Sequence, residues 1–162
     1  MKFRAILAVA CAAVTLSGCW ESTTPFITVP RIDDPGIVGE YTEGANSVTI
    51  TKSGDYWTKQ DANSTARFLR FDLVKPGWYI LQQDSLSGGE VQYGIINKKA
   101  DGTVVRYPGD CINSVAALKG VTRDEGGDCQ FASYEALVEA AKIYVAHLEK
   151  GGSVAVGTYV PK

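Results

Sequence analysis

The clearest hydrophobic pattern in the chain is an alternation of apolar and polar residues within 67–74. Its apolar members, which share one side, are Leu69, Phe71 and Leu73, whereas Arg70 and Asp72 point the other way. A period of two with one apolar face is typical of a half-buried antiparallel strand. Further strand-like runs of residues are predicted at 37–41, 47–51, 56–60, 78–82, 91–97 and 103–107.

Two hairpin turns join some of these runs. In Lys75-Pro76-Gly77, proline presets φ at the second turn position and glycine accepts a positive φ at the third. Residues 98–102 end in Gly102, which can supply the left-handed residue of a second hairpin. We therefore expect residues 37–107 to form a meander of short antiparallel strands.

After residue 108 the period of the apolar positions changes. A helical spacing of three and four relates Leu137, Val138, Ala141, Tyr144, Val145 and Leu148. Ser133 is a suitable N-cap and Gly151-Gly152 a suitable end, so this segment is predicted to be the main helix. A short helix capped by Asp110 is expected before it, and a final strand containing Val154, Val156 and Val160 after it.

These elements predict one α+β globular domain over residues 37–162. Its expected core is a curled antiparallel β-meander of six to eight short strands, packed or closed by the C-terminal α-helix. We expect the helix to cover the strand face that carries Phe71, because these are the purest apolar surfaces of the two elements.

A closed barrel is the alternative architecture. Gly39-Glu40-Tyr41, followed by a meander and a late helix, is similar to lipocalins and their opening Gly-x-Trp motif, with tyrosine in place of tryptophan. That resemblance implies a lipocalin-like β-barrel that carries a small apolar ligand in its interior.

The first 18 residues have a different character from the rest of the chain. Lys2 and Arg4 precede an apolar run over 5–16, which is shorter than the roughly 20 residues of a membrane-spanning helix. Two small residues follow the run, and this order is typical of a cleavable export signal.

The motif that ends this leader, Leu16-Ser17-Gly18-Cys19, resembles the lipobox of bacterial lipoproteins. The resemblance implies that residues 1–18 are a lipoprotein signal peptide, and that Cys19 becomes an N-terminal residue acylated with fatty acids such as palmitate. Because Trp20 and not aspartate follows the cysteine, the sorting pattern of Gram-negative lipoproteins implies an anchor in the outer membrane, facing the periplasm. Residues 19–36 contain Pro25, Pro30 and Pro35 and are predicted to be a flexible tether.

The remaining cysteines form an even pair. Cys11 lies in the leader and Cys19 is assigned to lipid, which leaves Cys111 and Cys129. In an oxidising compartment such a pair predicts one disulfide. A zinc site is a poor alternative, because the spacing is wrong and His147 is the sole histidine of the sequence.

Charge and motifs exclude several function classes. The net charge of −2 becomes more negative when Lys2 and Arg4 leave with the leader, which argues against nucleic acid as a partner. No nucleophile motif accompanies His147, so we expect neither an enzyme nor a cofactor. The carboxylates of residues 124–128 could suggest calcium, but their spacing is not that of an EF-hand.

Four aromatic residues on the predicted strands are candidates for partner binding: Tyr56, Trp57, Trp78 and Tyr79. Neighbouring strand residues face opposite sides, so one of each pair can serve the core while the other meets a partner. Alternatively, a curled sheet has two buried regions, one inside it and one under the helix, and both members are buried. The sequence thus predicts a membrane-anchored, non-enzymatic envelope lipoprotein that binds a protein partner or envelope component.

Overall fold

The computed structural model describes residues 19–28, 35–62, 65–68, 70–83 and 90–162. The strands are β1 (Trp20–Ser22), β2 (Gly39–Glu43), β3 (Asn46–Ser53), β4 (Tyr56–Gln60), β5 (Thr65–Phe68), β6 (Arg70–Lys75), β7 (Trp78–Gln83), β8 (Val91–Lys98), β9 (Val104–Pro108), β10 (Val121–Arg123), β11 (Cys129–Phe131) and β12 (Gly157–Pro161). The helices are α1 (Asn113–Ala116) and α2 (Tyr134–Leu148). The expectation of a β-rich fold with a C-terminal helix is confirmed.

The strands pair in an order that differs from a simple meander. The path runs β10-β11-β1-β8-β9-β12-β2-β3-β4-β5, and β7 connects β6 to β8. Both ends of the described chain are therefore inserted into the sheet: β1 lies between β8 and β11, and β12 lies between β9 and β2. Within the described residues, β5 pairs with β4 and β6 with β7, so the sheet is not closed as a lipocalin-like barrel would be.

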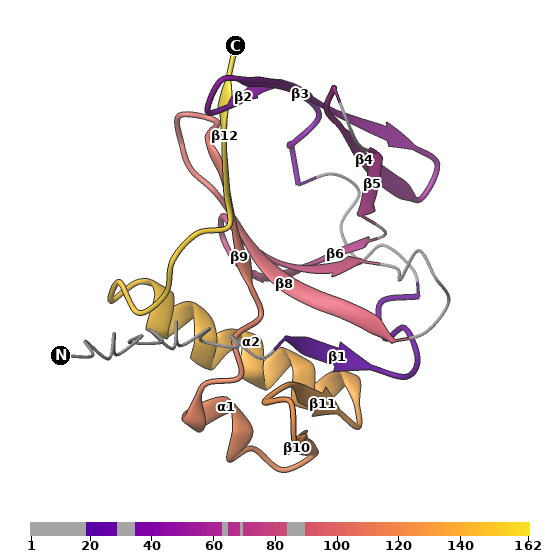
Figure 1. The fold of residues 1–162 in the computed structure, drawn as a ribbon, viewed down its shortest axis with the longest axis vertical. Coiled ribbons are helices and arrows are strands. Elements are labelled where there is room, and N and C mark those ends of the chain that lie inside the picture. The colour runs from indigo at the N-terminus through magenta and orange to yellow at the C-terminus, as the bar shows by residue number, and fades with distance from the viewer. Residues whose placement is uncertain (1–18, 29–34, 63–64, 69, 84–89) are drawn as a thin grey trace, which may run out of the picture.

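The sheet curls so that it has an inner face and a face covered by α2. Figure 1 shows β2–β5 curling over one side of the layer formed by β6 and β8, while α2 crosses the other side. Adjacent residues of a strand therefore reach different buried regions. On β7, Ile80 packs under the helix and Leu81 packs inside the curl; on β8, Ile95 and Ile96 divide in the same way.

The predicted strand alternation on β6 is present, but the side that the helix covers was wrongly predicted. Phe71 is buried inside the curl, opposite to the helix, and Leu73 on the same side is 48 % exposed. The helix covers the side of Asp72, whose carboxylate accepts a hydrogen bond from the Tyr134 hydroxyl at the start of α2. Phe71 on one side of β6 and Asp72 on the other are both buried, so alternation alone could not identify which side faces the helix. Leu69 lies outside the described residues.

The expected tether over 19–36 is wrong for its first part. Trp20–Ser22 form β1, and the side chain of Ile27 is completely buried in the cluster under the helix. The Ile27 amide donates to Gln82 Oε1 at 2.8 Å, and its carbonyl accepts from Arg70 Nη1 at 2.9 Å. The segment before the expected domain boundary at residue 37 is therefore part of the folded structure; residues 29–34 lie outside the described part.

The helical segment agrees closely with its sequence signals. The Ser133 hydroxyl accepts a hydrogen bond from the Ala136 amide, as an N-cap does, and Gly151 has a φ of 77° just beyond the end of α2. Two details differ from expectation. Ile112 and not Asp110 occupies the N-cap position of α1. The last strand begins only at Gly157, so Val154 and Val156 lie before it, and its buried residue is Tyr159.

The predicted disulfide is confirmed. Cys111 and Cys129 are bonded, with their Cα atoms 5.3 Å apart. The bond ties the segment before α1 to β11, and the α1–β10–β11 region between them packs beside the start of α2.

Candidate functional site

The residue that the sequence assigns to the lipid anchor lies at the start of the fold. Cys19 directly precedes β1, and its thiol is the free cysteine among the described residues. Its amide donates to the carboxylate of Asp128, and its carbonyl accepts a hydrogen bond from the Cys129 amide at 2.8 Å. The backbone of Cys19 is thus held on both sides by the segment that contains the disulfide.

The next residue fixes β1 in the core. Trp20 is completely buried, and its indole N–H donates to the Asp110 carbonyl at 2.9 Å. Its ring lies 5.5 Å from that of Phe131 and 5.2 Å from that of Tyr144, between centroids. Aromatic contacts at these distances add to the stabilisation from burial. Cys19 is therefore attached to one of the most firmly packed residues of the domain.

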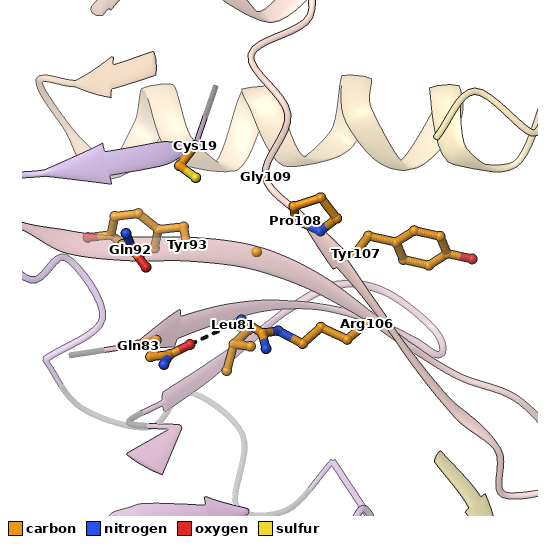
Figure 2. Close-up of a pocket in the computed structure, with 10 residues that line it drawn as sticks. Cys19, Leu81, Gln83, Gln92, Tyr93, Arg106, Tyr107, Pro108 and Gly109 are labelled. Atoms are coloured by element: carbon orange, nitrogen blue, oxygen red, sulfur yellow. Dashed lines mark hydrogen bonds between the residues drawn. The ribbon is translucent and has the colours of Figure 1, made fainter. Parts of the chain in front are cut away.

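Beside Cys19 there is a small pocket lined by residues of β7, β8 and β9. Figure 2 shows the Cys19 side chain at this pocket, with Gln92 and Tyr93 on one side and Pro108 and Gly109 on the other. Arg106 also lines it and donates from Nη2 to Gln83 Oε1 at 3.2 Å. The volume of the pocket is about 60 Å³, which is enough for a few water molecules and far below the roughly 300–1,000 Å³ of ordinary ligand pockets.

The electrostatic surroundings of Cys19 are acidic. Burial raises the pKa of its thiol, and the negative charges of Asp128, Glu21 and Asp110 raise it further. Burial also raises the pKa of Glu21, and the neighbouring Glu90 raises it further. A thiol in such a place is disfavoured as a thiolate, so the free protein offers little nucleophilic character at this position.

Asp110 connects three parts of the fold near this pocket. Its Oδ2 accepts a hydrogen bond from the Tyr144 hydroxyl at 2.8 Å and another from the Ser153 hydroxyl, while its carbonyl accepts from Trp20. Burial raises the pKa of Tyr144, which keeps the hydroxyl protonated as a donor. Asp110 therefore joins β1, α2 and the segment after α2.

The four candidate aromatic residues divide between core and surface. Trp57 is completely buried inside the curl, Tyr79 packs against the same cluster, and Trp78 packs under the helix and stacks on Tyr107. Tyr56 is 40 % exposed. The interpretation with two buried regions therefore describes three of the four, and they do not form a common surface. Tyr56 keeps the exposure that a binding residue needs.

The described side chains fill most of the space that they enclose inside the curl. Phe71, Leu81, Ile96 and their neighbours leave an apolar cavity of only about 20 Å³ between them. This volume is about that of one water molecule. A wider hollow of about 440 Å³, beside β11, lies open on the surface.

Other groups considered from the sequence have structural contacts. His147 Nε2 lies 2.8 Å from the Gly152 carbonyl, and its ring stacks on Tyr144. Asp124 closes the β10–β11 turn by accepting from the Asp128 amide at 2.8 Å. In the part of the chain that the structure describes, no group of three or more His, Cys, Asp or Glu side chains could hold a metal ion.

The contacts of Asp110 and Asp128 with the start of β1 were missed by sequence reasoning. The sequence predicted a helix cap for Asp110, and Asp128 was considered only among the carboxylates of residues 124–128. Their roles depend on the parallel pairing of β1 with β11, which joins residues far apart in the sequence. The signal that was available is position: Asp110 precedes one disulfide cysteine, and Asp128 precedes the other.

Comparison with protein-family models, curated proteins and solved structures finds no significant match to this chain. Among the helices of the described residues, none is long and apolar enough to cross a membrane.

Proposed function

We propose that this chain is a non-enzymatic envelope lipoprotein, anchored through lipid on Cys19, whose domain binds a protein partner or another envelope component. The observation that carries the proposal is the position of Cys19. The cysteine that ends the lipobox is unpaired and partly exposed, and it directly precedes β1. An acyl anchor there holds the whole domain at the membrane surface.

The filled interior favours partner binding over the carriage of a small apolar ligand. A carrier needs an internal cavity of roughly 300–1,000 Å³, whereas the cavity that the described residues leave inside the curl is about 20 Å³. On the outside, Tyr56 provides an exposed aromatic residue at the start of β4, beside the β3–β4 turn. Aromatic residues of this kind are frequent anchors of protein interfaces.

The anchor is tested by metabolic labelling with a radioactive fatty acid. Cys19→Ala should abolish the label and leave uncleaved or mislocalised precursor, because the acceptor sulfur is gone. Cys11→Ala is the matched control: it removes a leader cysteine and should keep the label. Equal labelling of the Cys19→Ala variant and the native protein contradicts the proposal.

Membrane assignment and partner binding are separate measurements. In a host with two membranes, the protein should sediment with the outer membrane on a density gradient, since Trp20 follows the acylated cysteine. Recovery with the inner membrane contradicts that assignment. Crosslinking of intact envelopes should capture a discrete partner, and Tyr56→Ala should reduce its yield more than Asp55→Ala, a change at the adjacent exposed residue.

A further inference from the structure

We infer that the domain lies directly against a phospholipid surface, with the Cys19 pocket facing the lipid, because no tether separates the anchor from the fold. This inference rests on the proposed function, namely lipidation of Cys19, and adds the orientation and the contact surface. A flexible tether of about 15 residues could reach on the order of 50 Å. Here the reach is that of one cysteine side chain.

The backbone contacts of Cys19 prevent it from moving away from the domain. Its carbonyl accepts from the Cys129 amide at 2.8 Å, and the following residue, Trp20, is completely buried. Trp20 pairs with Tyr93 on one side and Cys129 on the other, so β1 cannot leave the sheet without breaking two strand pairings. Only the side-chain torsions of Cys19 separate the sulfur from the rigid domain.

These contacts are compatible with a lipidated N-terminus. The nitrogen of an acylated cysteine still carries one N–H, and one N–H is what the Asp128 carboxylate accepts in the structure. The sulfur donates no hydrogen bond in the described contacts, and it borders a pocket of about 60 Å³ that opens to the surface. The first atoms of a thioether-linked glyceryl group can enter this space.

The pocket rim suits the interfacial region of a bilayer. Gln92 and Gln83 place amide groups and Arg106 a guanidinium at the pocket, so its lining is polar like the ester and phosphate region of a bilayer. Within the protein, Gln92 Nε2 donates to Glu21 at 3.4 Å and Arg106 Nη2 to Gln83 at 3.2 Å. The nearby carboxylates of Glu21, Glu90 and Asp128 disfavour attraction to anionic lipid. The contact is therefore imposed by the anchor, on a surface of zwitterionic phospholipid.

The test compares thiol accessibility at two exposed positions of the purified lipidated protein. Gln92→Cys places a thiol on the pocket rim, and Ser53→Cys places one at the end of β3, in the strands across the sheet from α2 (Figure 1). Each variant is inserted into preformed phosphatidylcholine–phosphatidylethanolamine vesicles and treated with a membrane-impermeant maleimide. Rates are divided by those of the same variant unfolded in urea, which corrects for intrinsic thiol reactivity.

We expect the Gln92→Cys thiol to react at least tenfold more slowly than the Ser53→Cys thiol on vesicles. A flexible Gly-Ser insert of about 12 residues between Cys19 and Trp20 should abolish that difference, because it restores a tether. The same insert at Gly54, a turn with open space around it, is the matched control and should leave the protection intact.

Equal corrected rates for the two thiols in the native background overturn the inference, and they do so even if the tethered variant fails to fold. Mass analysis of the Cys19 peptide separates the two levels of the proposal. If the Cys19 peptide carries no acyl groups, the proposed function itself is contradicted. If the peptide is acylated but the two thiols react at equal rates, the lipoprotein proposal stands, and only the orientation with the Cys19 pocket against the lipid is contradicted.

Discussion

Phe71 and Leu73 test how far the inner side of β6 is covered along the strand. Both belong to one side of the strand, yet Phe71 is 1 % exposed and Leu73 is 48 % exposed. Phe71 also meets the ring of Trp57 edge-to-face, with centroids 4.9 Å apart. Replacement of Phe71 by alanine therefore removes a fully buried ring and an aromatic contact, whereas the same change at Leu73 removes a side chain that is half in solvent.

The two substitutions should differ by at least about 2 kcal/mol in the free energy of unfolding. Phe→Ala in a packed core costs about 3–5 kcal/mol, including the cavity that remains. Leu73→Ala should cost about 1 kcal/mol or less, because only part of its apolar area is buried. Against a total stability of about 5–15 kcal/mol, the loss at Phe71 is large enough to move the unfolding midpoint clearly.

Urea unfolding of the purified protein, followed by circular dichroism, measures both variants. The slope of the unfolding free energy against urea should stay unchanged, so that the midpoint shift reports stability. Similar losses for Phe71→Ala and Leu73→Ala would refute the difference in burial described above. Arg70→Ala separately tests the side of β6 that faces α2. It should cost about 1–3 kcal/mol, because the guanidinium donates to the Ile27 carbonyl and is not freely solvated.

Three further results are expected. Replacement of both Cys111 and Cys129 by alanine should lower stability by about 3 kcal/mol, since it releases a loop with a sequence separation of 18; an unchanged urea midpoint contradicts this. Tyr144→Phe should cost about 1–3 kcal/mol through the lost bond to Asp110, and a neutral result would mean that the bond is not made. Burial raises the pKa of Glu21, so stability should fall as pH rises from 4.5 through its folded-state pKa. Glu21→Gln should remove that fall, and melts whose pH dependence is unaltered contradict the assignment.

Local signals in the sequence predicted the elements that depend on local interactions. The Ser133 cap and the helical spacing around Leu137 identified α2, and Pro76-Gly77 identified the β6–β7 hairpin. Gly77 has the positive φ, 80°, that this turn requires. The disulfide followed from counting cysteines. Each of these features is determined by residues that are close together in the chain or by covalent chemistry.

The features that the sequence did not predict depend on distant partners. β1 has three residues, too few for a period to be visible, and its stability comes from β8 and β11. The side of β6 under the helix could not be read from apolar alternation, because a curled sheet buries both of its faces. For the candidate site, Cys19 was identified by its motif, whereas Asp110 and Asp128 become its neighbours only through the β1–β11 pairing.

The position of β1 also sets an order of events during synthesis. Cys19 and its carboxylate partner Asp128 are separated by 109 residues, which a ribosome adds in about 5–20 s at 5–20 residues per second. Until Asp128 and Cys129 have been synthesised, the hydrogen bonds that they make with the Cys19 backbone cannot form. Under the proposed function, the enzymes that process Cys19 therefore have a period of seconds before its backbone makes these bonds. If fewer residues separated β1 from β11, the two strands could pair sooner, and the time available for processing would be shorter.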